Sequence, residues 1–451
     1  MKVLFISLGC DKNLVDSEHM LGMLSENGYS ITDDECEADV IVVNTCCFIH
    51  DAKEESIENI IEMARYKTEG NLKALVVTGC LAQRYKEEIR KEIPEVDAVI
   101  GTTAYDDIVK VVDSIVTKNK EELTKEGVAT NNSFKDINYL TKNGNKRILT
   151  TGGYTSYLKI AEGCNKNCTY CIIPKLRGKF RSVPMEELLK EATSLAEQGI
   201  KELILVAQET TLYGVDIYGE KKLPELLREL CKIDGFEWIR ILYTYPEEIT
   251  DELIQVIKEE DKICKYIDMP IQHASDAILR KMGRRTNRQD LVNLITKLRD
   301  EIDDIVIRTT LITGFPGETE EDFESLLDFV YDMSFERLGV FAYSAEEGTR
   351  AADMDNQVDD DIKEARRNAI MEMQQDITFD YMSSLEGNIM KVIIEGYIAD
   401  DDIYVGRTYM DAPGIDGLVF VDSDRNHMSG DIIIAEITAS KGYDLIATEV
   451  Y

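Results

Sequence analysis

The sequence has little positive charge, few histidines and no long apolar run, and each of these features argues against certain kinds of binding site or location. Lys and Arg number 51 against 86 Asp and Glu, which gives a formal net charge of −35. Proteins that bind nucleic acid normally need a basic surface to neutralise phosphates, so we do not expect direct RNA binding. No segment reaches the roughly 18 consecutive apolar residues of a membrane-spanning helix, so no membrane span is expected either. An acidic surface instead favours a basic partner, and the alternative is that the acidity simply serves solubility or reflects a salty habitat.

We expect no secretion signal at the start of this sequence. The opening MKVLFISLGC has a lysine, an apolar run and a cysteine, as lipoprotein signals do, but the run is shorter than a signal core of about 7–15 residues. It is better interpreted as a first buried strand. Ten cysteines without an export signal predict a cytoplasmic protein whose thiols are reduced and serve as ligands, not as disulfides.

Three closely spaced cysteines are the strongest chemical signal: Cys164, Cys168 and Cys171 in EGCNKNCTYCIIP. Thiolates are the usual protein ligands of iron–sulfur clusters. Three thiolates on a four-iron cluster leave one iron open for chemistry. The alternatives are a zinc knuckle or unrelated loop cysteines. Zinc sites usually take four ligands, often including histidine, whereas this segment offers no fourth ligand and the whole chain has four histidines.

Three more cysteines directly follow apolar runs in the first third of the chain. The runs are residues 2–9, 38–45 and 73–79, and the cysteines are Cys10, Cys46 and Cys80. Helix-like stretches separate the runs, which predicts a parallel sheet covered on both faces. Ligands of such sheets bind beyond the carboxyl ends of the strands. The three thiols could therefore hold a second iron–sulfur cluster, although buried core cysteines are the alternative.

The other cysteines are interpreted from their context. Cys47 neighbours Cys46, and we choose Cys46 as the ligand because it comes directly after the NT turn, as the other two cysteines follow LG and TG. Cys36, Cys231 and Cys264 lack this context and are interpreted as packing residues.

From about residue 150 to 345 the chain alternates strand and helix. The expected strands are residues 157–163, 202–208, 238–244, 266–272, 305–314 and 337–344. Six such units fit an open, partial (β/α)6 barrel, whose active site gathers at the carboxyl ends of the strands. The loop with Cys164 follows the first of these strands, where that rule places a functional site.

Polar and glycine-rich groups at the other strand ends suit a cofactor. The candidates are Tyr170 in the cysteine loop, Gln208 and Glu209 after the second strand, Gln272 and His273 after the fourth, and Gly314 and Glu318 in TGFPGET after the fifth. The glycines would let the backbone approach an adenosyl group. The alternative is that these are ordinary turn, capping or core residues.

From about residue 383 short alternating runs predict some five antiparallel strands in a small barrel. Residues 383–451 contain 13 acidic and 4 basic residues, so this part has a net charge of 4 − 13 = −9. Small barrels of this kind often bind RNA through a basic face, and this one is acidic. We expect an α/β chain with domains at 1–140, 150–380 and 383–451.

Six segments together resemble the radical S-adenosylmethionine (radical SAM) methylthiotransferases. They are FISLGCDKNLVDSE, NTCCFIHDAKEESI, VVTGCLAQRY, EGCNKNCTYCIIPKLRGKFRS, MPIQHASDAILRKMGR and TTLITGFPGETEEDF. The resemblance covers the whole chain and implies an N-terminal methylthiotransferase domain, a radical SAM core and a C-terminal TRAM barrel. It implies two 4Fe-4S clusters, an auxiliary one on Cys10, Cys46 and Cys80 and a SAM-reducing one on Cys164, Cys168 and Cys171. S-adenosylmethionine would be both radical source and methyl donor.

Within that family, LRGKFRS and PIQHASD resemble the branch that modifies a ribosomal protein. The implied reaction adds a methylthio group to the β-carbon of an aspartate in the small-subunit protein that lines the decoding centre. The alternative is a tRNA-adenosine methylthiotransferase, which the net charge disfavours. The acidic C-terminal barrel would dock the basic substrate protein. No motif assigns the reductant or the sulfur donor.

Two further classes of protein fit the sequence less well. A non-catalytic electron carrier or iron sensor has no need of a six-unit barrel with a cofactor loop. A radical enzyme of another reaction type has no need of the N-terminal cysteines.

Overall fold

The computed structural model describes residues 1–117, 132–143 and 146–450. The chain divides into two compact units, which are described separately. Unit 1 comprises Met1–Thr150, Ala161–Lys166 and Cys171–Val183. Unit 2 comprises Thr151–Ile160, Asn167–Tyr170 and Pro184–Tyr451. Among the described residues, no helix is both long enough and apolar enough to cross a membrane.

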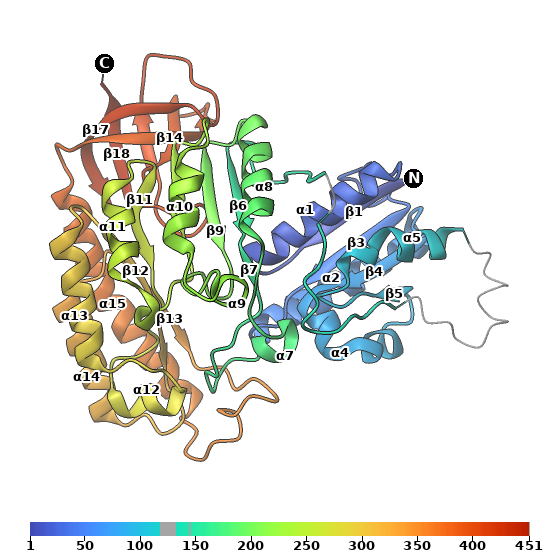
Figure 1. The fold of residues 1–451 in the computed structure, drawn as a ribbon, viewed down its shortest axis with the longest axis horizontal. Coiled ribbons are helices and arrows are strands. Elements are labelled where there is room, and N and C mark those ends of the chain that lie inside the picture. Colours follow the sequence, from blue (N-terminus) through green and yellow to red (C-terminus); the bar gives the residue numbers. More distant parts are fainter. Residues whose placement is uncertain (118–131, 144–145, 451) are drawn as a thin grey trace. The chain divides into compact units, whose positions relative to one another are not determined.

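Unit 1 is built on a parallel five-stranded sheet with the order β2-β1-β3-β4-β5 (Figure 1). The strands are β1 (Lys2–Ser7), β2 (Ser30–Ile31), β3 (Val40–Thr45), β4 (Ala74–Thr78) and β5 (Ala98–Val99). The three predicted strands are β1, β3 and β4, and they are direct neighbours at the centre of the sheet. The edge strands β2 and β5 are two residues long, too short to show in the hydrophobic pattern.

Helices cover both faces of this sheet. The helices are α1 (Asp11–Glu26), α2 (His50–Ala64), α3 (Tyr66–Glu69), α4 (Gly79–Glu92), the 3-10 turn η1 (Tyr105–Asp107) and α5 (Ile108–Val116). Val40 and Val42 of β3 belong to a buried cluster with α1 and α5, whereas Ile41 and Val43 belong to one with α2 and α4. Because β3 is buried on both sides, its sequence is a continuous apolar run and not an alternating one.

The segments that flank the cysteine loop also belong to unit 1. The strand β7 (Ala161–Glu162) pairs antiparallel with β8 (Arg181–Ser182), and the short helix α7 (Ile173–Arg177) lies between them in sequence. Leu176 of α7 is buried in the same apolar cluster as Ile60 of α2. These contacts anchor the chain on either side of the loop in unit 1.

Unit 2 contains an open sheet of six parallel strands, which confirms the predicted partial barrel (Figure 1). In spatial order the strands are β6 (Thr155–Lys159), β9 (Glu202–Val206), β10 (Trp238–Ile241), β11 (Ile263–Asp268), β12 (Val306–Thr313) and β13 (Arg337–Ala342). The connecting helices are α8 (Met185–Glu197), α9 (Val215–Tyr218), α10 (Leu223–Cys231), η2 (Pro246–Glu248), α11 (Asp251–Glu259), α12 (Asp276–Met282), α13 (Arg288–Glu301) and α14 (Glu320–Met333). Capping boxes begin α13 at Asn287 and α14 at Thr319, which fixes where these helices start.

The helix α15 (Asp360–Ser384) leads to a closed barrel in the order β14-β15-β16-β18-β17. Its strands are β14 (Ile389–Ile398), β15 (Ile403–Arg407), β16 (Val419–Asp422), β17 (Ile432–Lys441) and β18 (Asp444–Glu449). The pairings are antiparallel as expected, except that β16 and β18 run parallel.

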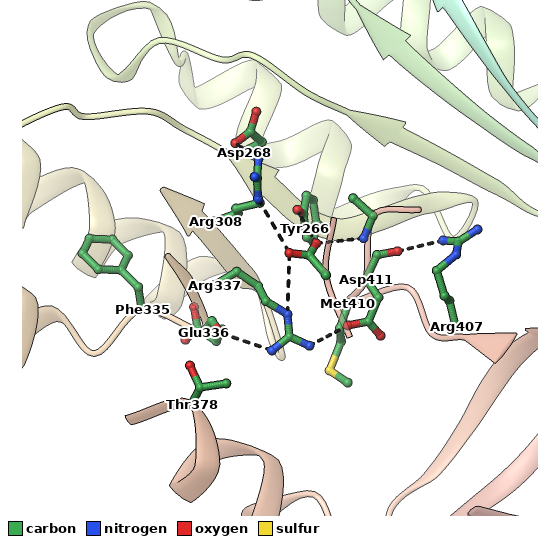
Figure 2. Close-up of polar contacts among 12 residues, drawn as sticks. Tyr266, Asp268, Arg308, Phe335, Glu336, Arg337, Thr378, Arg407, Met410 and Asp411 are labelled. Carbon is green, nitrogen blue, oxygen red and sulfur yellow. Dashed lines mark hydrogen bonds and ion pairs between the residues drawn. The ribbon is translucent and has the colours of Figure 1, made fainter. Parts of the chain in front are cut away.

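A buried ion network joins this small barrel to the six-stranded sheet within unit 2. Arg407, at the end of β15, is fully buried and its Nη2 lies 2.7 Å from Oε2 of Glu202 on β9. Arg240 of β10 binds the other oxygen of Glu202 at 2.8 Å. Figure 2 shows the neighbouring part, where Arg337 of β13 pairs with Asp411. Because each buried charge has an opposite partner, the small barrel is an integral part of unit 2.

Candidate functional site

The ends of the three central strands of unit 1 place three cysteines along one edge of the sheet. Cys10 directly precedes α1, Cys46 directly follows β3, and Cys80 lies in the first turn of α4 after β4. Cys46 and Cys80 are buried and Cys10 is partly exposed. The edge is therefore a partly accessible site lined by sulfur.

Two glycines allow the loops at the strand ends to pack directly against one another. Gly9 and Gly79 have φ values of +90° and +92°, which favour glycine. A Cβ on Gly9 would lie 2.6 Å from Cβ and 2.8 Å from Sγ of Cys46. A Cβ on Gly79 would lie 2.4 Å from Oδ1 of Asn44. The LG and TG turns before Cys10 and Cys80 are thus required for the backbone to pack against the neighbouring loop.

Side-chain hydrogen bonds hold these loops in place. Nδ2 of Asn13 donates to the carbonyl oxygens of Leu8 and Thr45, at 2.9 and 3.0 Å. Oγ of Ser56, on α2, accepts from the amide of Cys46 at 3.0 Å and donates to its carbonyl at 2.9 Å. The sequence analysis missed both residues. The signal available for Asn13 was the polar DKN run directly after Cys10.

The thiols of this edge interact with one another. Burial, together with the neighbouring Cys80 and Cys10, raises the pKa of Cys46 to about 11. Burial also raises the pKa of Cys80. Without a metal these two thiols keep their protons at neutral pH, and a bound metal would have to displace them.

The position of Cys46 differs from that of Cys47. The sulfur of Cys46 faces Gly9, the residue before Cys10, whereas Cys47 is fully buried in the apolar cluster that includes Ile60. Of the cysteines interpreted as packing residues, Cys264 is buried and Cys231 is partly buried. The interpretation is wrong for Cys36, which is exposed because it lies in a surface turn.

The arrangement of Cys10, Cys46 and Cys80 suits a cluster better than a single ion. Around tetrahedral zinc, with Zn–S bonds near 2.3 Å, sulfurs lie roughly 3.8 Å apart. In the described part of the chain, the only His, Cys, Asp or Glu ligands that gather in a group of three within 4.8 Å are those of His50, Asp51 and Glu54, which are exposed. At least two of the three edge sulfurs are therefore more than 4.8 Å apart, a spacing that a cluster with several irons allows.

A buried arginine lies beside this edge. Nη1 of Arg177 is 2.9 Å from Oε2 of Glu162 and 3.1 Å from Oδ2 of Asp16. Its Nη2 donates to Oδ1 of Asn13. Arg177 lies in the LRGKFRS segment, and nothing in the sequence alone assigns this residue a role.

The cysteine loop places two of its thiols in buried positions, those of Cys164 and Cys168, and Cys171 is partly buried. In unit 1 the amide of Cys164 donates to the carbonyl of Gly178 at 3.1 Å, and its sulfur accepts from the amide of Lys166 at 3.4 Å. Amide donors of this kind stabilise negative charge on a ligating sulfur. In unit 2 the sulfur of Cys168 lies 4.0 Å from the Tyr245 hydroxyl.

The other predicted cofactor residues lie at the carboxyl ends of the strands of unit 2. Glu209 is fully buried and its Oε1 accepts from the amide of Thr211 at 3.1 Å, while Gln208 beside it is partly exposed. Tyr170 is partly buried against the cluster that contains Phe315 and Tyr343.

The TGFPGE turn is organised by its own glutamate. Oε2 of Glu318 accepts from the amides of Gly314 and Phe315, at 2.9 and 3.3 Å. Its Oε1 accepts from Nη1 of Arg366 at 2.7 Å, and Nε2 of His273 lies 3.4 Å from Oε2. In this structure the carboxylate of Glu318 shapes the loop, and Gly314, with φ +69°, is where the chain turns.

Two further features mark the same edge of unit 2. Tyr243 and Gln272, after β10 and β11, have positive φ values of 60° and 73°, and such strain gathers at functional sites. Arg284 is buried with its guanidinium 4.4 Å from the centre of the Tyr245 ring, and its Nε finds no hydrogen-bond partner among the described residues. Arg284 ends the MPIQHASDAILRKMGR segment, and nothing in the sequence alone distinguishes it from its neighbours.

Three family descriptions match successive parts of the chain. "Uncharacterized protein family UPF0004" matches residues 2–101, "Radical SAM superfamily" matches 158–330, and "TRAM domain" matches 387–450. The matched ranges follow the parallel sheet of unit 1, the six-stranded sheet and the small closed barrel.

Curated relatives match over nearly the full length. The ribosomal protein uS12 methylthiotransferase RimO of Lachnoclostridium phytofermentans is 62% identical, with 99% of this chain and 100% of the relative covered. The protein of the same name from Clostridioides difficile is 50% identical, with 100% and 99% covered.

Solved structures share the fold at low sequence identity. The radical S-adenosylmethionine methyltransferase TsrM from Kitasatospora setae has a TM-score of 0.53 at 15% identity, covering 76% of this chain and 74% of its own. The cobalamin-dependent S-adenosylmethionine radical enzyme OxsB also has a TM-score of 0.53, at 12% identity, covering 82% and 56%. These likenesses concern the arrangement of the strands and helices alone.

Proposed function

Because the chain belongs to the ribosomal protein uS12 methylthiotransferases of the RimO family, we propose that it adds a methylthio group to the β-carbon of an aspartate of uS12. The observation that carries this proposal is the occurrence of two separate sets of three cysteines, one at the ends of three strands of a parallel sheet and one in a single loop, in a chain 62% identical to such an enzyme. Ribosomal proteins are made in the cytoplasm, and we place the reaction there.

We assign the ligands of two 4Fe-4S clusters to these cysteines. Cys10, Cys46 and Cys80 would hold the auxiliary cluster, and Cys164, Cys168 and Cys171 the cluster that serves S-adenosylmethionine. When bound, the clusters and S-adenosylmethionine supply the radical and sulfur chemistry that an aspartate β-carbon, inert to acid–base catalysis, requires. The position of Cys46 beside Gly9 supports it, and not Cys47, as the third auxiliary ligand.

The residues of the barrel edge would hold and orient S-adenosylmethionine. Tyr170, Gln208 and Glu209 stay our candidates for contact with it, with Gly314 and Glu318 shaping the loop that approaches it. We add Arg284, because a buried guanidinium whose Nε lacks a partner among the described residues suits the carboxylate of the cofactor.

We also propose the three-domain division 1–140, 150–380 and 383–451. The family matches at 2–101, 158–330 and 387–450 support one functional domain in each range. In this division the loop with Cys164 and Cys168 belongs to the second domain in sequence, although Cys164 packs with the first compact unit.

The C-terminal barrel would dock the substrate protein by charge. Asp400, Asp401 and Asp402 are exposed on the turn between β14 and β15. Of the four cations in residues 383–451, Arg407 is buried against Glu202, so three remain exposed to solvent, namely Lys391, Arg425 and Lys441. The outer surface therefore stays acidic, which favours a basic protein over RNA.

The test is an anaerobic assay in which two alternative substrates are offered in separate reactions. Reconstituted protein is incubated with S-adenosylmethionine, a reductant, a sulfide source and either recombinant uS12 or unmodified tRNA. Mass spectrometry of both products should find the methylthio group on an aspartate of uS12. The same group on tRNA adenosine, with uS12 unchanged, would reverse the assignment.

A further inference from the structure

Arg177 is one of the largest fully buried side chains in the described part of the protein, and its contacts gather around cysteine-bearing segments. It is the last residue of α7, six positions after Cys171. Its side chain is 2% exposed, and it pairs with two carboxylates, those of Asp16 and Glu162. A buried guanidinium with this many partners is held in one place.

The partners of Arg177 belong to segments that carry different cysteines. Asn13 and Asp16 are on α1, three and six positions after Cys10. Glu162 is on β7, two positions before Cys164. One side chain in unit 1 thus ties the start of α1 to the strand that enters the cysteine loop and to the helix that leaves it.

Arg177 also lies against a predicted ligand. The guanidinium of Arg177 lies within hydrogen-bonding reach of the sulfur of Cys80. It also donates to Asn13, whose own side chain donates to Leu8 and Thr45 in the loops that lead to Cys10 and Cys46. Asp16 and Glu162 carry two negative charges against the single positive charge of the arginine, and they hold the guanidinium in position. Replacing Arg177 by a neutral residue removes the positive charge and leaves these two carboxylates in place.

A second arginine of unit 1 is similarly buried and also pairs with a carboxylate of α1. Nε and Nη2 of Arg147 lie 2.9 and 2.6 Å from Oε2 of Glu18, which is also on α1. Its side chain is 5% exposed, similar to that of Arg177. Arg147 lies in a described stretch, residues 146–150, that contains no cysteine. It is therefore a matched control.

We propose that Arg177 is a positioning residue for the auxiliary cluster, which holds Cys80 in place and raises the reduction potential of the cluster by its fixed positive charge. The inference rests on the proposed function, since it assumes a cluster on Cys10, Cys46 and Cys80. Net charge and hydrogen bonds to the sulfurs are the protein's main means of setting such potentials. A nearby cation favours the reduced cluster, which carries one more negative charge.

The test uses the full-length chain with Cys164, Cys168 and Cys171 replaced by Ala, so that only the auxiliary cluster can form. Arg177→Gln, Arg177→Lys and Arg147→Gln are introduced into it. Iron and sulfide content, thermal stability and the midpoint potential, from a redox titration followed by electron paramagnetic resonance, are measured for each. Arg177→Gln should move the midpoint to more negative values, Arg177→Lys should restore most of the shift, and Arg147→Gln should lower stability with the midpoint unchanged.

The outcomes separate the possible failures. An unchanged midpoint in Arg177→Gln with full iron content overturns the inference. If Arg177→Gln loses iron while Arg147→Gln retains it, the positioning role is supported; equal loss in both overturns it, because general destabilisation then explains the effect. If the background chain with intact Arg177 binds no cluster, the proposed function itself fails.

Discussion

The two sets of three cysteines are built in different ways. Cys164, Cys168 and Cys171 occupy one stretch of eight residues, so the covalent chain alone keeps them close. Cys10, Cys46 and Cys80 are 36 and 34 residues apart and meet only because β1, β3 and β4 are neighbours. The auxiliary site therefore depends on the fold of unit 1, and a change that distorts its sheet edge should affect iron at that site first.

The difference also lies in what surrounds the sulfurs. The auxiliary edge relies on glycine turns and on side-chain hydrogen bonds from Asn13 and Ser56. The cysteine loop relies on backbone amides, as at Cys164, and lies next to groups suited to a cofactor. We infer that the first environment suits a cluster held by the fold, whereas the second combines cluster ligands with candidate contacts for a cofactor.

The largest expected effect comes from removing each set. Replacing Cys10, Cys46 and Cys80 with Ala should abolish methylthiolation of uS12 but preserve cleavage of S-adenosylmethionine. Replacing Cys164, Cys168 and Cys171 should abolish both. Chromatography of 5′-deoxyadenosine and mass spectrometry of uS12 measure the two steps. If the variant without Cys10, Cys46 and Cys80 keeps its iron at the loop site but no longer cleaves S-adenosylmethionine, the two sets of cysteines do not have separate roles.

The buried ion network of unit 2 contrasts with the two cysteine sites, because disrupting it should lower the stability of the protein without changing its iron content. Arg407→Met would leave Glu202 with one of its two arginine partners, and breaking a buried pair costs about 3–5 kcal/mol. Chemical denaturation should show this loss. Iron on the auxiliary site, measured in the chain that lacks the loop cysteines, should be unchanged; a parallel loss of that iron would show that the two regions are not independent.

The glycine before Cys10 gives a sharper test of the sheet edge. Gly9→Ala introduces a strained positive φ, at about 1–3 kcal/mol, and a Cβ that would collide with Cys46. Iron at the auxiliary site should fall together with stability. Gly28→Ala is the matched control, because Gly28 has φ +88° but nothing within 4 Å of its added Cβ. Equal iron loss in both variants would mean that strain, and not the displacement of Cys46, is responsible.

Much of this arrangement could be predicted from the sequence because it follows from local patterns. The continuous apolar runs predicted β1, β3 and β4 and the six strands of unit 2, and the position of a cysteine directly after a run placed it at a strand end. The edge strand β2, at two residues, is too short to show a pattern. The parallel pairing of β16 and β18 depends on how the barrel closes. The alternation of apolar and polar residues predicts a strand, but it does not predict which strand pairs with it or in which direction.

The residues that support the site could not be predicted, because their contacts join distant segments. Arg177 meets Asn13 across 164 positions, and no periodicity links the two. Arg284 was visible within a quoted motif, but its burial against Tyr245 depends on how α12 and the loop after β10 pack. Glu318 was predicted as a cofactor contact, and its bonds to the amides of its own turn became visible only in the structure.

The smallest expected effect distinguishes two adjacent cysteines. Cys47→Ala should leave the iron content of the auxiliary site unchanged and cost about 1 kcal/mol of stability, since it removes one buried side-chain atom from the apolar cluster. Cys46→Ala should lower the iron content of the same site. Iron analysis on the chain without the loop cysteines measures both. The opposite result would make Cys47 the ligand.

Iron and sulfide counting on the anaerobically reconstituted full chain tests most directly whether two clusters form. The account predicts about eight irons and eight sulfides per chain, falling to about four of each when either set of cysteines is replaced with Ala. Zinc in place of iron, or the loss of all iron on removal of one set, would contradict it.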